Sequence, residues 1–177
     1  MAEYKRRGVG KREVDYEKIV TENIDFVYRV ALCYCKNQRD AEDVVQDTFL
    51  KLIQSKQEFA DGEHIRKWLI RVAVNECKNI WKSYWKRNVI SLDKLEYEHE
   101  SAGTEEQQEL LQAVMSLSPK YRIVVHLYYY EGYHVKEIAD MLHLSESNVQ
   151  IRLMRARKKL KDLLEEESIY QSRQQRC

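Results

Sequence analysis

Apolar side chains recur every three or four residues along most of the chain, which is the spacing that places them on one face of an α-helix. Before residue 88 this pattern predicts three helices, at about residues 15–35, 40–54 and 64–86. The first is long enough to bend or break, and its predicted apolar side consists of Ile19, Ile24, Val27, Ala31 and Leu32. The connections at 36–39 and 55–63 are short, which favours a compact bundle of antiparallel neighbours.

The helical period fails between residues 88 and 103, where charge is high, and this segment is predicted to be a flexible linker. Helical spacing returns at 104–115. Ser118 and Pro119 then predict the start of a helix that runs to Tyr130 and buries Ile123, Val124 and Leu127. The predicted fold is all-α, with two small helical domains at 15–88 and 104–167, a linker at 89–103, and tails at 1–14 and 168–177.

Residues 132–160 have the pattern of a helix-turn-helix, a short helix followed by a tight turn and a longer basic helix. Ser145 is the expected N-cap of the second helix, with Asn148 three residues later in place of the Glu or Gln of a capping box. The predicted buried positions are Ile138, Ala139, Leu142, Val149, Leu153, Ala156 and Leu160. The second helix of such a motif lies in a DNA major groove.

The outward positions of this second helix are mostly cationic, and they are Gln150, Arg152, Arg155, Arg157, Lys158, Lys159 and Lys161. Early side chains of a recognition helix reach base edges, whereas later cations contact phosphates. An alternative is that cations gather here only to offset the negative end of the helix dipole. That alternative explains Lys158 to Lys161 well but Arg152 and Arg155 less well, because these two lie nearer the middle of the helix.

The predicted helix at 64–86 interleaves cations with aromatic residues. Leu69, Val72, Ala73 and Ile80 form its predicted buried stripe, and the remaining positions include Arg66, Lys67, Trp68, Arg71, Lys78, Trp81, Lys82, Tyr84, Trp85 and Lys86. Cations follow a nucleic-acid backbone and aromatic rings stack on unpaired bases, so this composition suits single-stranded nucleic acid. Core packing is the favoured interpretation for Trp68, but Trp81, Tyr84 and Trp85 cannot all fit one buried stripe, so at least one should be exposed.

The predicted helix at 40–54 has two unlike faces. One is apolar, with Ala41, Val44, Val45, Phe49, Leu52 and Ile53. The other carries Asp43, Gln46, Asp47 and Leu50, at spacings that place them together. An acidic face with a leucine in its middle fits a protein-docking surface, in which charges pair at the rim and the apolar group anchors the partner. It equally fits an ordinary solvated face with one stray leucine.

Composition limits the other classes of function. The net charge is +1, yet residues 62–88 and 145–162 are basic and residues 91–110 are acidic, which suggests two nucleic-acid surfaces on two domains. The four cysteines lack zinc-ligand spacing and are expected to be reduced thiols. The basic N-terminal segment lacks the apolar core of a secretory signal, and no apolar run could span a bilayer, so a cytoplasmic protein is expected. Scattered histidines and the lack of a Gly-rich loop predict no active site and no cofactor.

Residues 40–50, 68–75, 133–139 and 149–157, in that order and spacing, resemble bacterial RNA polymerase sigma factors of the extracytoplasmic-function group. The resemblance covers about residues 15–164. It implies a factor with sigma regions 2 and 4 that binds core RNA polymerase, through the clamp helices of its largest subunit and its flap, and directs it to promoters. Such factors commonly have a cognate anti-sigma factor, in some cases anchored in the membrane.

The resemblance also implies roles for individual residues. Docking on polymerase falls to Asp43, Gln46, Asp47 and Leu50. Contact with the −10 element falls to Phe59, Arg71, Asn75, Lys78 and Lys82, with Phe59, Asn75 and the loop at 55–63 holding a flipped base. Contact with the −35 element falls to Gln150, Arg152, Met154, Arg155, Arg157 and Lys158. Ile151 occupies a position often given to serine in relatives.

Two other functions remain open from the residues themselves. A regulator that binds duplex DNA without polymerase would also need the helix-turn-helix, although the helix rich in cations and aromatics counts against it. A pure interaction protein, such as a regulator of sigma factors, would not contact DNA at all.

Overall fold

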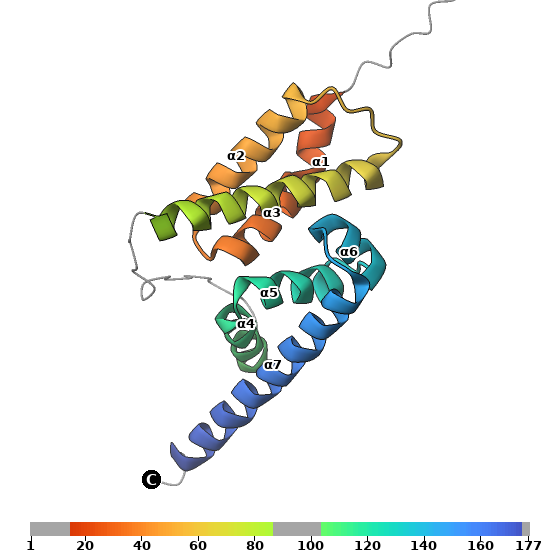
Figure 1. The fold of residues 1–177 in the computed structure, drawn as a ribbon. Helices are drawn as coiled ribbons and strands as arrows, with labels where there is room; N and C mark the ends of the chain where they lie inside the picture. Colours follow the sequence, from red (N-terminus) through yellow and green to blue (C-terminus); the bar gives the residue numbers. More distant parts are fainter. Residues whose placement is uncertain (1–14, 87–103, 175–177) are drawn as a thin grey trace, which may run out of the picture.

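The computed structural model describes residues 15–86 and 104–174, whose regular secondary structure is entirely helical. The first body contains α1 (Tyr16–Cys35), α2 (Gln38–Gln54) and α3 (Gly62–Lys86). The second contains α4 (Glu105–Ser116), α5 (Pro119–Val125), the π-helical turn η1 (His126–Tyr130), α6 (Val135–Leu142) and α7 (Glu146–Gln174), as Figure 1 shows. The all-α fold is confirmed, and the predicted linker and N-terminal tail lie outside the described residues.

Capping side chains set where the helices begin. The Asp15 carboxylate accepts a hydrogen bond from the Lys18 backbone N–H at 3.0 Å, at the start of α1. Asn37 does the same for the N–H of Asp40 at 3.1 Å, which explains why α2 begins at Gln38 rather than at the predicted residue 40. Thr104 and Gln107 form a reciprocal capping box at the start of α4. The α1 helix runs from Tyr16 to Cys35 without a break, although its length would have allowed one.

The core of the first body is formed where α1, α2 and α3 pack pairwise. Its fully buried side chains include Val30, Ala31, Val44, Leu69, Ile70, Ala73 and Cys77. The predicted apolar sides were partly wrong, because Ile24 is 40% exposed and Ile53 is 52% exposed. On α1 the buried side includes Asn23, whose amide group donates to the Ile19 carbonyl at 2.8 Å, so a polar residue occupies a place that the hydrophobic spacing gave to Ile24. On α3, Val72 and Ile80 are only half-buried, whereas Val74 and Cys77 are buried.

The second body contains the predicted helix-turn-helix. Ile138, Ala139 and Leu142 of α6 are buried in one cluster with Val149 and Leu153 of α7. Further along α7, Ala156 is buried in a second cluster with residues of α4 and α5, and Leu160 is half-buried against that cluster. The Ser145 hydroxyl accepts from the Asn148 N–H at 3.2 Å, which confirms the predicted N-cap. The predicted burial of Ile123, Val124 and Leu127 is also confirmed. The α7 helix continues to Gln174, past the end of the predicted second domain at 167.

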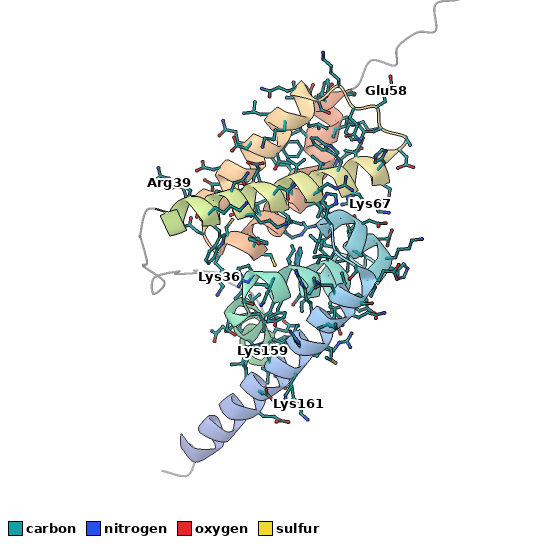
Figure 2. The ribbon with its side chains drawn as sticks, in the orientation of Figure 1. Lys36, Arg39, Glu58, Lys67, Lys159 and Lys161 are labelled. Carbon is teal, nitrogen blue, oxygen red and sulfur yellow. The ribbon has the colours of Figure 1, made fainter. Side chains whose placement is uncertain are left out.

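The two bodies share one hydrophobic core. Helix α1 packs against α5, and α3 packs against α6, so the first body lies directly on the helix-turn-helix (Figure 1). Two ion pairs lie at the edge of this contact: Lys67 Nζ is 2.7 Å from a Glu137 carboxylate oxygen, and Arg29 Nε is 3.2 Å from Glu131. Figure 2 labels Lys67 where α3 meets the second body.

Candidate nucleic-acid and polymerase-docking surfaces

The α3 helix gathers the predicted −10 residues on one face. Arg71, Asn75, Lys78 and Lys82 are spaced so that they fall on one side of the helix. Asn75 and Lys82 are exposed, whereas Arg71 and Lys78 are half-buried. Burial, followed by the charges of Arg152 and Lys82, lowers the pKa of Lys78. The structure therefore brings these predicted residues together on one face of α3, part of which is half-buried.

Phe59 is held against the N-terminal part of α3. Its ring packs edge-on against Trp68, with centroids 5.7 Å apart, and against His64 at 5.5 Å. The Asp61 carboxylate accepts from the His64 backbone N–H at 2.7 Å, and the His64 ring accepts from the Ala60 N–H at 3.3 Å. These bonds fix the loop that presents Phe59. Trp68 and Asn75 are about two helical turns apart, or roughly 10 Å.

The aromatic residues of α3 are divided between core and surface. Trp68 is half-buried and packs against the core, in agreement with the interpretation favoured from the sequence. Trp81 is half-buried. The side chains of Tyr84 and Trp85 lie outside the described residues, so the prediction that at least one of these aromatic rings is exposed stays a prediction.

The face of α2 that carries Asp43, Gln46, Asp47 and Leu50 is entirely exposed in the described structure. Leu50 is 46% exposed. Ile53, three residues later, is 52% exposed and therefore belongs to this surface rather than to the core. The sequence analysis had assigned Ile53 to the opposite, apolar face of the helix. The exposed surface thus has two adjacent apolar side chains with carboxylates on one side.

The predicted −35 residues lie along the N-terminal half of α7. Gln150, Met154, Arg155, Arg157 and Lys158 are exposed, and Arg152 is half-buried. The Nε of Arg152 donates to the Asn148 side-chain oxygen at 2.7 Å. A hydrogen bond from Arg155 lowers the pKa of Tyr121. Figure 2 shows that α7 carries further cations beyond these, at Lys159 and Lys161.

An aromatic support for Arg157 is a feature that sequence reasoning missed. The Nε of Arg157 donates to the Tyr129 hydroxyl at 2.8 Å, and its guanidinium lies 5.9 Å from the centre of that ring. Tyr128 packs edge-on against Tyr129, with ring centroids 5.0 Å apart. The three consecutive tyrosines at 128–130 were the available signal, but the π-helical turn that orients them is not visible from spacing.

Within residues 15–86 and 104–174 no three or more His, Cys, Asp or Glu side chains are grouped so that they could hold a metal ion. None of the helices described here is both long and apolar enough to cross a membrane.

Comparison with known proteins connects the two bodies to one family. The family model for sigma-70 region 2 matches residues 19–87, and that for sigma-70 region 4 matches residues 107–160. SigM of Bacillus subtilis, an extracytoplasmic-function RNA polymerase sigma factor, is 32% identical over 143 residues, covering 77% of this chain and 87% of SigM. SigE of Mycolicibacterium smegmatis is 28% identical over 165 residues, and the match spans 63% of its length.

Two solved structures have the same arrangement of helices. The sigma factor RpoE from Bartonella quintana, in complex with the anti-sigma factor NepR, is similar with a TM-score of 0.70 and 22% identity, over 85% of this chain and 97% of RpoE. CnrH, in complex with the cytosolic domain of CnrY, is similar with a TM-score of 0.60 and 25% identity, over 85% of this chain and 87% of CnrH.

The fold and these matches define a class of protein: a helical transcription factor that carries a helix-turn-helix in its second body. The chain belongs to the extracytoplasmic-function group of the sigma-70 family. It is a sigma factor that directs transcription initiation with RNA polymerase.

Proposed function

We propose that the exposed α2 face binds the clamp helices of the polymerase largest subunit. The observation that carries this assignment is the exposure of Leu50 and Ile53 beside Asp43, Gln46 and Asp47. Apolar groups desolvated at the centre of an interface supply binding energy, and charges at the rim supply orientation and partner choice. The protein acts in the cytoplasm, where it meets core polymerase, and it requires no catalytic residue of its own.

The proposal assigns −10 recognition to α3 and to the loop before it. Phe59 is already held by Trp68 and His64, and Asn75 is exposed on the same helix. A base that leaves the duplex loses a few kcal/mol of stacking and pairing, which an aromatic ring and an amide can replace by stacking and hydrogen bonding. Arg71, Lys78 and Lys82 follow the phosphate backbone.

The proposal assigns −35 recognition to the N-terminal half of α7. Gln150, Arg152, Met154 and Arg155 lie where a recognition helix enters the major groove, and Arg157 and Lys158 lie near phosphates. Polymerase places both bodies on one promoter, with the flap supporting the second.

Regulation by an anti-sigma factor is part of the same proposal. CnrH, 25% identical to this chain, was solved with the cytosolic domain of CnrY bound to it. A cognate inhibitor of this chain would compete with polymerase for the α2 face. Purification from the native host should therefore recover two populations, one with polymerase and one with the inhibitor; recovery with polymerase alone under all conditions would oppose this assignment.

Run-off transcription with purified core polymerase tests the function directly. Addition of the chain should produce transcripts from a defined set of promoters, whose start points then give the −10 and −35 sequences. A gel shift separates the main alternative: tight, site-specific binding of duplex by the chain without polymerase would indicate a polymerase-independent regulator instead.

A further inference from the structure

Two apolar side chains are exposed in the middle of the cationic face of α7. Ile151 is 45% exposed and Met154 is 59% exposed. They are three residues apart and so lie on the same side of the helix, away from the buried Val149 and Leu153. A single exposed apolar residue is ordinary. Here, however, the pair lies among the exposed polar side chains of Gln150, Arg155 and Lys158.

The charge around the pair favours duplex DNA as its partner, since cations contact phosphates on both sides of a groove. In the major groove, thymine alone among the four bases presents a methyl group, which apolar side chains contact. We propose that Ile151 and Met154 read the C5 methyl groups of thymines in the −35 element. This specificity rests on the proposed contact between α7 and that element.

Replacement of thymine by uracil tests this inference, because uracil differs only by the loss of the methyl group. Templates carry uracil at one −35 position at a time, and initiation is measured with the holoenzyme. At each position that is read, uracil should lower initiation about fourfold, the factor that corresponds to burial of one CH₂-sized group. The variant Ile151→Ala or Met154→Ala should lose this sensitivity at its own position.

A matched control is available on the same helix. Leu163 is also apolar and is 37% exposed, about two and a half turns beyond Met154. Leu163→Ala should keep the full response to uracil. Promoter-specific initiation that is indifferent to uracil at every −35 position, or a selected −35 element without thymine on either strand, would overturn the inference. Failure to initiate at any promoter would instead overturn the proposed function, and it would be detected before uracil is introduced.

A second inference comes from the contact between the bodies. Arg122 of α5 has no exposed surface, and its guanidinium donates to four backbone carbonyls. Two belong to the end of α4, Met115 at 2.8 Å and Leu117 at 2.6 Å. The other two belong to the last turn of α1, Cys33 and Tyr34, the latter at 2.9 Å. The last carbonyls of a helix lack partners within it and form the negative end of its dipole.

Arg122 therefore caps a helix of the other body. Helix α1 has no basic residue in its own last turn and is followed by Lys36 as its C-cap, and the cation that hydrogen-bonds to its last carbonyls comes from α5. We call these four hydrogen bonds of Arg122 the latch between the bodies. Beside the latch, α3 and α6 are joined by the 2.7 Å contact between Lys67 and Glu137. The −10 and −35 elements are about 25 base pairs apart, or roughly 85 Å of duplex. Two DNA-binding bodies that touch one another cannot both reach elements at that separation.

We infer that Arg122 is the latch of a closed resting form in this chain, and that its hydrogen bonds to the end of α1 break when the factor binds polymerase and the two bodies separate. In the closed form Lys78 of α3 and Arg152 of α7 are both half-buried, so one side chain of each DNA surface is only partly accessible. The first body also covers α6, the helix that positions the recognition helix.

Zero-length crosslinking tests the closed form. A carbodiimide joins a lysine amine and a glutamate carboxylate as an amide with loss of water, and the carbodiimide takes up that water to become a urea. Free protein should yield the Lys67–Glu137 crosslink, identified by mass spectrometry. Lys51 and Glu76, an ion pair wholly inside the first body, provide the control because separation of the bodies leaves them together.

In purified holoenzyme the Lys67–Glu137 yield should fall at least fivefold while the Lys51–Glu76 yield is unchanged. Free protein that gives only the Lys51–Glu76 product would overturn the closed form. Persistence of Lys67–Glu137 in a holoenzyme that initiates from its promoter would overturn the opening step. Failure of the chain to co-elute with core polymerase would bear on the proposed function and not on the closed form.

Discussion

The buried guanidinium of Arg122 can be tested as a single side chain. In Arg122→Met, an apolar chain of similar length leaves the carbonyls of Cys33, Tyr34, Met115 and Leu117 without this donor. Each buried carbonyl left unpaired costs about 1–3 kcal/mol. The free energy of unfolding, measured with urea, should therefore fall by about 3 kcal/mol or more. Arg122→Lys keeps the charge but has fewer donors, so its free energy of unfolding should lie between those of the wild type and Arg122→Met. An unchanged urea midpoint for Arg122→Met would contradict the capping role.

Asn75 is a test of the −10 assignment at the same scale. Asn75→Ala should reduce strand opening more than holoenzyme binding, since the amide is proposed to hold a base that has already left the stack. Permanganate reactivity of −10 thymines reports opening, and a gel shift of the holoenzyme reports binding. Asn79→Ala provides the control, because Asn79 is exposed one turn further along α3 and donates to Glu76 at 3.5 Å. Full permanganate reactivity in Asn75→Ala would show that Asn75 does not hold the flipped −10 base.

At the scale of the helices, local chemistry was sufficient to place most elements. Ser145 and Pro119 predicted helix starts that the structure confirms, because N-caps and first-turn prolines depend on neighbouring backbone groups alone. The errors arose where packing decides. The spacing around Ile24 and Ile53 is apolar enough to predict burial, yet which side of a helix is covered depends on its neighbours. The π-helical turn at η1 likewise follows from packing.

The α2 face yields a prediction that uses one of these errors. Leu50→Ser should weaken binding to core polymerase by roughly tenfold, since about 1.4 kcal/mol is lost when a half-exposed leucine can no longer be buried in an interface. Ile53→Ser should have a similar effect, because Ile53 belongs to the same surface. Ile24→Ser is the control, as Ile24 is 40% exposed on a different helix. Competition for core polymerase against a reference sigma factor gives the affinities. Equal affinity of all three variants would show that the α2 face does not contribute to docking.

At the scale of the whole molecule, the sequence indicated two helical bodies but not the contact between them. Charge blocks and periodicity are local signals, whereas the latch joins Arg122 to carbonyls almost ninety residues earlier in the chain. Backbone carbonyls carry no sequence signature, and Arg122 alone is an ordinary helix residue. For the same reason the individual −10 and −35 side chains were predictable as helix faces, but the partial burial of Lys78 and Arg152 was not.

The rim of this contact makes its stability depend on pH. The hydrogen bond from Lys67, together with the His134 backbone N–H, lowers the pKa of Glu137, and Glu63 is the other carboxylate beside Lys67. Burial would raise the pKa of Glu131, but hydrogen bonds from His126 and Arg29 outweigh it and the net pKa is lowered. His126 and His134 belong to the same body as the two glutamates, so only the lowering due to Lys67 and Arg29 stabilises the closed form. That contribution is complete above the ordinary value of 4.5 and is lost as the pH falls through the lowered pKa values.

Acid should therefore open the molecule before it unfolds it. The radius of gyration, from small-angle X-ray scattering, should rise below pH 4.5 while far-UV circular dichroism still reports helix. Lys67→Glu should show the larger radius already at neutral pH, because two carboxylates then face each other, and Lys67→Glu with Glu137→Lys should restore the compact form. Lys161→Glu, which changes an ion pair to Glu165 within α7, is the control and should stay compact. A radius that is the same in all variants and at every pH above unfolding would show that these ion pairs do not hold the bodies together.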